Sequence, residues 1–127
     1  MSDSRGYVFP HSKVSWGIIG VGDVCERKAG PALYKASRSS LAAVMRRTKH
    51  KAEDFAARHG VPGAYDSVEA LLADAAVNAV YIASPVAFHA EHALAVAKAG
   101  LPCLLEKPMA RCVLCERCTL EMSVCLI

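Results

Sequence analysis

The sequence predicts an α/β fold: a doubly wound, mainly parallel sheet of about five strands with helices on both faces and no second domain. Length and composition are the first two observations. The 127 residues make about one domain, and 54% of them are hydrophobic, which is enough for one core. The third is a repeated pattern of short, continuous apolar runs, each followed by a segment of helical composition. This pattern is typical of parallel strands that are buried on both faces.

The first unit is a strand followed by a broken helix. The apolar run at 14–19 contains β-branched residues and ends in glycines, so we expect a buried strand and a turn. A helix begins near Asp23. We expect Gly30 and Pro31 to interrupt it before a helical composition resumes at 32–36.

The second unit has clearer boundaries. An apolar run at 41–45 predicts the next strand, and apolar residues recur at helical spacing over 52–59. Gly60 and Pro62 are typical stop signals for that helix. A short strand is expected around 64–65.

The remaining elements follow the same order. Asp66 is the expected N-cap of a short helix, with Glu69 three residues later. The run at 78–83 predicts a strand, the apolar face at 90–97 a helix, and 101–105 the last strand.

Charge and hydropathy argue against several classes of protein. The 15 basic and 12 acidic side chains give a net charge of +3, too small to make nucleic acid the default partner. No stretch reaches the roughly 18 apolar residues of a membrane span, and residues 1–13 hold no apolar block typical of a secretory signal. We therefore expect a cytoplasmic location, a flexible segment at 1–13, and neither nucleic acid nor membrane as partner.

A glycine turn follows the first predicted strand. Gly20 permits a tight turn, and Gly22 lets the backbone approach a pyrophosphate. Asp23 and Val24 begin the next helix, whose unpaired N–H groups and dipole favour a phosphate. A cysteine occupies the third motif position, where Gly or Ala is usual. In this context the turn predicts a dinucleotide site in a Rossmann domain over 14–110, and a plain strand-to-helix turn is the alternative.

Basic residues occupy the position after the second strand where the motif expects an acid. Arg46 and Arg47 stand there, and the chain has no acidic residue between Glu26 and Glu53. A carboxylate would repel a 2′-phosphate, whereas guanidinium groups bind it. This favours NADP as cofactor, with NAD possible. The alternative for these arginines is a solvated basic surface.

Several segments together resemble the Gfo/Idh/MocA family of NAD(P)-dependent oxidoreductases, from about residue 15 to 111. They are Gly20-Val21-Gly22, Tyr81-Ile82-Ala83-Ser84-Pro85, His89, Ala99-Gly100 and Glu106-Lys107-Pro108. The resemblance implies a Rossmann domain for the cofactor. It also implies hydride transfer between NADP(H) and a sugar, cyclitol or diol-like substrate. A non-catalytic dinucleotide-binding or interaction module is the alternative function.

The resemblance further implies roles for individual residues. Glu106, Lys107 and Pro108 are expected beside the nicotinamide, and Lys107 is the expected catalytic residue. Its ammonium group can donate a hydrogen bond to a substrate oxygen and stabilise negative charge there. Ser84 and Pro85 resemble the family's cofactor-contacting loop.

Three of the five histidines bear on the site. His89 matches the family's histidine and is expected at the cofactor, with a capping or packing role as the alternative. His59 and His92 match no role, and we expect them at the surface or at its boundary.

The segment 111–127 is expected to be a divergent cysteine-rich tail. Family members continue into a larger α/β domain that holds the substrate, so the sequence reads as a fragment that would not turn over substrate alone. Four of the six cysteines lie in this tail, and C-x-x-C-x-x-C permits a metal interpretation. We expect free thiols and no metal. The apolar edge of the last strand predicts self-association.

Overall fold

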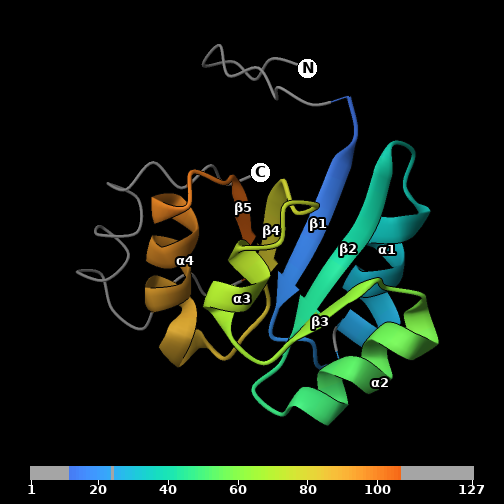
Figure 1. Ribbon diagram of the computed structural model, residues 1–127, viewed down its shortest axis with the longest axis horizontal. Coiled ribbons are helices and arrows are strands. Elements are labelled where there is room, and N and C mark those ends of the chain that lie inside the picture. The colour runs from blue at the N-terminus through green and yellow to red at the C-terminus, as the bar shows by residue number, and fades with distance from the viewer. Residues whose placement is uncertain (1–11, 24, 107–127) are drawn as a thin grey trace.

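The computed structural model describes residues 12–23 and 25–106. Within them the strands form one parallel sheet of 5 strands in the order β3-β2-β1-β4-β5 (Figure 1). The strands are β1 (Val14–Ile19), β2 (Ser39–Met45), β3 (Gly63–Tyr65), β4 (Ala79–Ile82) and β5 (Cys103–Leu105). The doubly wound parallel sheet that the sequence predicts is confirmed.

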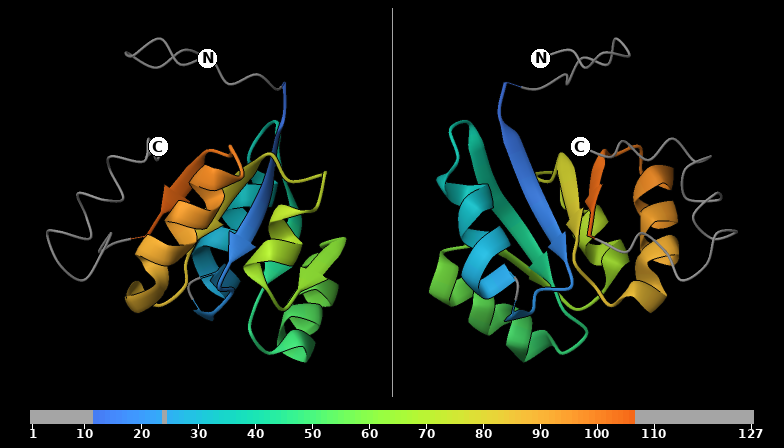
Figure 2. Two further views of the ribbon diagram at one scale, coloured as in Figure 1. Left: turned by 60° about the vertical axis from the view of Figure 1, so that its left-hand side comes forward. Right: turned by 180° about the vertical axis from the view of Figure 1, so that it is seen from behind.

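Helices cover both faces of this sheet (Figure 2). A π-helix, η1, leads directly into α1, and α2 packs on the same face. Helices α3 and α4 pack on the opposite face, with the 3₁₀ helix η2 just before α4. The helices are η1 (Cys25–Ala29), α1 (Gly30–Lys35), α2 (Lys49–His59), α3 (Val68–Leu72), η2 (Val86–Phe88) and α4 (His89–Lys98).

The sheet separates two apolar cores. Neighbouring residues of a strand point to opposite faces, so Ile18 packs under α2 while Ile19 packs under α3 and α4, and both are fully buried. The same division holds in β4, where Tyr81 and Ile82 belong to different cores. Burial on both faces explains why the strands read as continuous apolar runs rather than alternating ones.

A polar link at the amino end of β1 allows a tryptophan to be buried. The indole Nε1 of Trp16 donates a hydrogen bond to Ser39 Oγ at 3.0 Å, and the Ser39 hydroxyl donates in turn to the Leu33 carbonyl. Trp16 is only 8% exposed. Since the one polar atom of the indole has a partner, the large ring enters the core without an unsatisfied donor.

Two local predictions differ from the structure. The helix after the glycine turn is not broken at Gly30 and Pro31, because η1 continues directly into α1 with a change from π to α geometry. The predicted N-cap Asp66 is wrong. Ser67 caps α3, because its hydroxyl oxygen accepts a hydrogen bond from the Ala70 N–H at 3.2 Å.

Some predictions concern residues outside the described part of the chain. These are most of the segment 1–13, the tail 111–127 with its cysteines, and the individual residues Val24, Lys107 and Pro108. In the described part, no helix combines the length and the apolar character needed to cross a bilayer.

An ion-pair network joins η1 to α2 at the protein surface. The Arg58 guanidinium binds both carboxylate oxygens of Glu26, and His59 Nε2 lies 2.8 Å from the same carboxylate. Arg58 also donates to Asp54 at 2.9 Å. The hydrogen bonds from Arg58, followed by the smaller contribution of His59, lower the pKa of Glu26 from 4.5 to about 2. The network therefore fixes the helix after the glycine turn against α2.

The lowered pKa of Glu26 predicts a pH-dependent contribution to stability. Because its pKa is lower in the folded state, Glu26 stabilises the fold fully above pH 4.5 and loses this effect as the pH falls towards about 2. We expect Glu26→Gln to be less stable than the unmodified chain at pH 7, with the difference disappearing between these two pH values. Urea unfolding followed by circular dichroism at a series of pH values measures this difference.

Asp54→Asn is the matched control. Asp54 binds the same arginine through an exposed i,i+4 pair, which contributes little to stability. An equal loss of stability in both variants, or a difference for Glu26→Gln that does not change with pH, would contradict the prediction.

Candidate functional site

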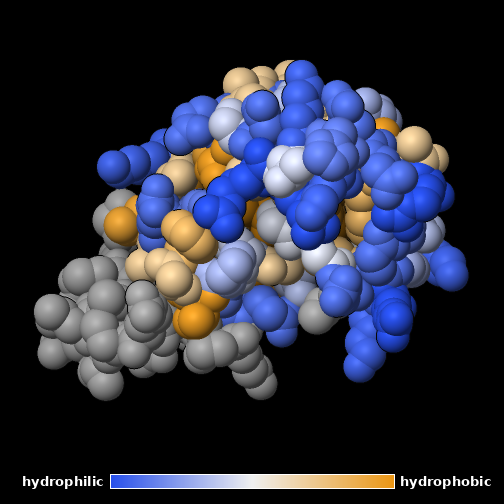
Figure 3. Space-filling model, turned by 90° about the horizontal axis from the view of Figure 1, so that it is seen from below, coloured by the Kyte–Doolittle hydropathy of each residue, from blue (hydrophilic) through white to orange (hydrophobic). Residues whose placement is uncertain are grey.

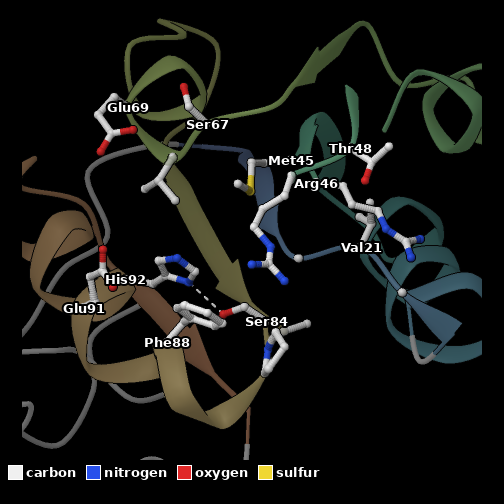
Figure 4. Close-up of a pocket in the computed structure, with 16 residues that line it drawn as sticks. Val21, Met45, Arg46, Thr48, Ser67, Glu69, Ser84, Phe88, Glu91 and His92 are labelled. Atoms are coloured by element: carbon white, nitrogen blue, oxygen red, sulfur yellow. Dashed lines mark hydrogen bonds between the residues drawn. The ribbon is translucent and has the colours of Figure 1, made fainter. Parts of the chain in front are cut away.

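A cavity of about 660 Å³ opens where β1, β2 and β4 end (Figure 4). Because β2 pairs with one side of β1 and β4 with the other, the strand order reverses at this point, where open α/β sheets bind ligands. Figure 3 shows this edge of the molecule, where hydrophilic residues dominate and apolar atoms are visible between them. The lining includes these predicted site residues: Gly20, Gly22, Arg46, Arg47, Ser84 and Pro85.

Gly20 brings the ends of two strands into contact. Its φ is +88°, and a Cβ built on it would lie 2.6 Å from both the backbone N and the Cα of Ser84. The Gly20 N–H donates to the Met45 carbonyl at 2.9 Å, which holds the turn against the end of β2. A side chain at this position would have to displace the backbone that follows β4.

Gly22 plays a different part, because it lines the cavity and faces open space. No heavy atom lies within 4 Å of a Cβ built on this residue. Its carbonyl accepts a hydrogen bond from the Glu26 N–H at 3.0 Å, so the chain turns helical immediately after it. The bare backbone at Gly22 leaves room for a phosphate group beside the start of this helical segment.

The residues after β2 bring positive charge to the cavity. The Arg46 backbone N–H donates to the Tyr65 carbonyl at 3.0 Å, which fixes the start of the loop. Arg46 is half-buried and Arg47 is exposed, and the Arg47 guanidinium carbon lies 5.2 Å from the centroid of the Phe88 ring. Thr48 adds a hydroxyl group to the same wall. Guanidinium and hydroxyl groups together are suited to binding a phosphate.

Helices η2 and α4, which follow β4, contribute an aromatic pair that the sequence does not predict. His92 and Phe88 both line the cavity, with their rings stacked at 5.9 Å between centroids and 18° between planes. His92 Nδ1 is 2.7 Å from Ser84 Oγ (Figure 4). Burial lowers the pKa of His92, which favours the neutral ring and a hydrogen bond donated by the Ser84 hydroxyl.

His92 is half-buried, in keeping with its expected place at the boundary, but it also lines the cavity, which the sequence does not predict. Its ring lies in the cavity wall because α4 begins at His89, which places residue 92 one turn into that helix beside Ser84. The spacing of Ser84 and His92 in the sequence gives no sign of this contact. His59 contacts Glu26 and Tyr34, away from the residues that line the cavity.

His89 is buried beside the loop rather than in the cavity lining. It is 2% exposed, and its Nε2 donates to the Ser84 carbonyl at 2.6 Å. Among the described residues that line the cavity, His89 does not occur. Its geometry fits a residue that positions the Ser84 backbone, which is the packing alternative noted for it above.

Glu106 is anchored where β5 ends. Its backbone N–H donates to the Ile82 carbonyl at 3.0 Å, and the Tyr81 hydroxyl donates to its carboxylate. Burial, together with the bond to Glu106, raises the pKa of Tyr81 well above its usual range. The start of the Glu-Lys-Pro segment is thus tied to β4 by both backbone and side chain.

Comparison with known proteins identifies the family of the chain. The family described as "Oxidoreductase family, NAD-binding Rossmann fold" matches residues 14–119. The chain belongs to the Gfo/Idh/MocA oxidoreductases. The family resemblance expected from the glycine turn and the Glu-Lys-Pro segment is confirmed. The sheet and its helices therefore form the NAD(P)-binding Rossmann domain of a Gfo/Idh/MocA protein.

Curated relatives align with most of this chain. Oxidoreductase P35 of Formosa agariphila is 50% identical over 98 residues, which cover 77% of this chain and 30% of the relative. D-xylose 1-dehydrogenase (NADP(+)) 2 of Haloferax volcanii is 40% identical over 94 residues, which cover 74% of this chain and 29% of the relative. The chain therefore spans about 30% of the length of these Gfo/Idh/MocA relatives.

A solved structure gives the same fold. KijD10, a 3-ketoreductase from Actinomadura kijaniata, was solved as a variant in complex with TDP-benzene and NADP. It superimposes with a TM-score of 0.82 at 28% identity, and the match covers 88% of this chain and 34% of KijD10.

The different surroundings of the two glycines predict different effects of substitution. We expect Gly20→Ala to lower the free energy of unfolding by about 2 kcal/mol or more, because the methyl group meets the Ser84 backbone at a positive φ. We expect Gly22→Val to keep the stability of the unmodified chain while weakening dinucleotide binding, because its side chain enters the space for the phosphate. Urea unfolding and cofactor titration measure the two effects. Normal stability of Gly20→Ala, or full cofactor binding by Gly22→Val, would refute the assignment concerned.

Proposed function

We propose that this Rossmann domain binds NADP(H) in the cavity at the ends of β1, β2 and β4, and binds NAD(H) less tightly. The observation that carries the proposal is the pair Arg46 and Arg47, which line the cavity at the position after β2 where the motif usually has an acidic residue. The name of the Haloferax relative specifies NADP, and the KijD10 complex contains it.

The described residues that line the cavity fit the phosphate groups of such a cofactor. The open backbone at Gly22 suits the pyrophosphate, and Gly20 forms the turn before it. We assign Asp23 and Val24 to the same phosphate on their position in the motif. Arg46 and Arg47, with Thr48, suit the phosphate on the adenosine ribose. Towards the nicotinamide we assign Ser84, Pro85, Glu106, Lys107 and Pro108, as the family resemblance implies. The buried His89 is assigned to position the Ser84 backbone beside them.

We further propose that the whole protein is an oxidoreductase for a sugar, cyclitol or diol-like substrate. Relatives with related names support this class: scyllo-inositol 2-dehydrogenase (NADP(+)) IolU of Bacillus subtilis is 40% identical over 70 residues, 55% of this chain and 21% of the relative. When bound, the nicotinamide accepts or supplies the hydride. Lys107 is assigned to donate a hydrogen bond to the substrate oxygen whose negative charge develops. A panel of polyols and sugars, assayed with the longer protein and with Lys107→Met, tests this step.

We also propose a cytoplasmic location and self-association of the chain. Strand β5 borders the described sheet, and Cys103 and Leu105 on it are buried in the α3/α4 core. Further backbone pairing along β5 by a second molecule would produce the association. Light scattering after size exclusion, with and without reductant, measures it, and a sharp monomer peak at high concentration would contradict it.

The cofactor preference is the decisive prediction. We expect the unmodified chain to bind NADPH more tightly than NADH, and Arg46→Asp to weaken NADPH binding about tenfold to a hundredfold, because a charge-assisted hydrogen bond is replaced by repulsion. NADH binding should change far less. Titration of the fluorescence of each reduced cofactor measures both affinities.

Lys51→Asp is the matched control for net charge. Lys51 is an exposed residue of α2 outside the lining of the cavity, so this variant changes the total charge by the same amount without altering the site. Equal affinity of the unmodified chain for the two cofactors would overturn the proposal. An equal effect of both substitutions would show that only the general field of the protein matters.

A further inference from the structure

The two arginines after β2 differ in what they contact. Both line the cavity, and the Arg47 guanidinium also lies over the Phe88 ring, at 5.2 Å from its centroid. Arg47 comes from the loop after β2 and Phe88 from η2 after β4, so this contact joins the loops of two different strands. We propose that Phe88 is a specificity-determining residue, which positions Arg47 for the 2′-phosphate of NADP(H). This inference rests on the proposed function. It adds Phe88 as the residue through which Arg47 distinguishes NADP(H) from NAD(H).

A cation over an aromatic ring is held without losing its hydrogen-bonding capacity. The ring attracts the face of the guanidinium, whereas the N–H donors of the guanidinium point outward from its edge. A stacked arginine can therefore still bind a phosphate through its edge. An exposed arginine would otherwise lose side-chain entropy on binding, and the contact with Phe88 reduces this loss in advance.

The charge of Arg47 also remains available. Glu69 and Glu91 line the same cavity, yet among the described residues neither forms an ion pair with Arg47. A carboxylate partner would neutralise the guanidinium and compete with the phosphate. Because an uncharged ring holds Arg47 instead, the cation is ordered without being neutralised.

The position of Phe88 is itself fixed by contacts within the loop. Its backbone N–H donates to the Pro85 carbonyl at 2.9 Å, and its ring stacks on His92, 5.9 Å away. His92 is held by Ser84 Oγ at 2.7 Å, and the Ser84 backbone in turn lies against Gly20. Arg47 is thus connected through a continuous set of contacts to the glycine turn, where the pyrophosphate is proposed to bind.

The test compares NADPH and NADH affinities in the full chain. We expect Phe88→Leu to weaken NADPH binding about fivefold while NADH binding changes less than about twofold. Phe88→Tyr should bind NADPH as tightly as the unmodified chain, because it keeps the aromatic ring. Circular dichroism and urea unfolding check that each variant folds. If Phe88→Leu does not fold, Phe88→Met serves as a second non-aromatic variant.

A double-mutant cycle separates the two arginines. In an Arg47→Met background, Phe88→Leu should have no further effect on NADPH affinity. In the matched Arg46→Met background it should keep its full effect. The same loss in both backgrounds, or an equal loss of NADPH and NADH affinity, would show a merely structural role and overturn the inference.

The outcomes also distinguish this inference from the proposed function. An unmodified chain without preference for NADPH would overturn the proposed function and this inference with it. A chain that prefers NADPH through Arg46 and Arg47, but keeps its full preference in Phe88→Leu, would overturn this inference alone.

Discussion

The contact between the Gly20 turn and the Ser84 backbone is the constraint on which the cavity depends. It joins the loops that follow β1 and β4, which lie on either side of the point where the strand order reverses. With these loops in contact, the residues after β2 and those after β4 face one space, and Gly22 lines the same space. A side chain at Gly20 would separate the loops, so the shape of the cavity depends on glycine at this position.

The fold could be predicted largely because of its layered architecture. Strands buried on both faces show as uninterrupted apolar runs, and β1 begins and ends where such a run does. Predictions at the ends of elements were less accurate. Asp and Ser are both common N-caps, so the residue types at 66 and 67 do not decide which of the two caps α3.

The candidate site divides in a similar way. The sequence predicts Gly20, Gly22, Arg46 and Arg47 at one site from their position in a strand-turn-helix unit, and all four line the cavity. The contact of His92 with Ser84 is not predicted, because the two residues are separated by the loop after β4, η2 and the first turn of α4. Contacts between loops from different strands, such as that of Arg47 with Phe88, arise only from the assembled sheet.

The buried indole of Trp16 gives the domain a built-in optical probe. It is the one tryptophan of the sequence, it belongs to the core under α2, and it lies towards the amino end of β1, whereas the cavity opens at the opposite end of that strand. Its fluorescence emission wavelength therefore reports the entry of water into the core under α2. Substitutions in the cavity wall should leave this wavelength unchanged, because Trp16 does not line the cavity. One chromophore can follow the melting of this layer in every variant without a label.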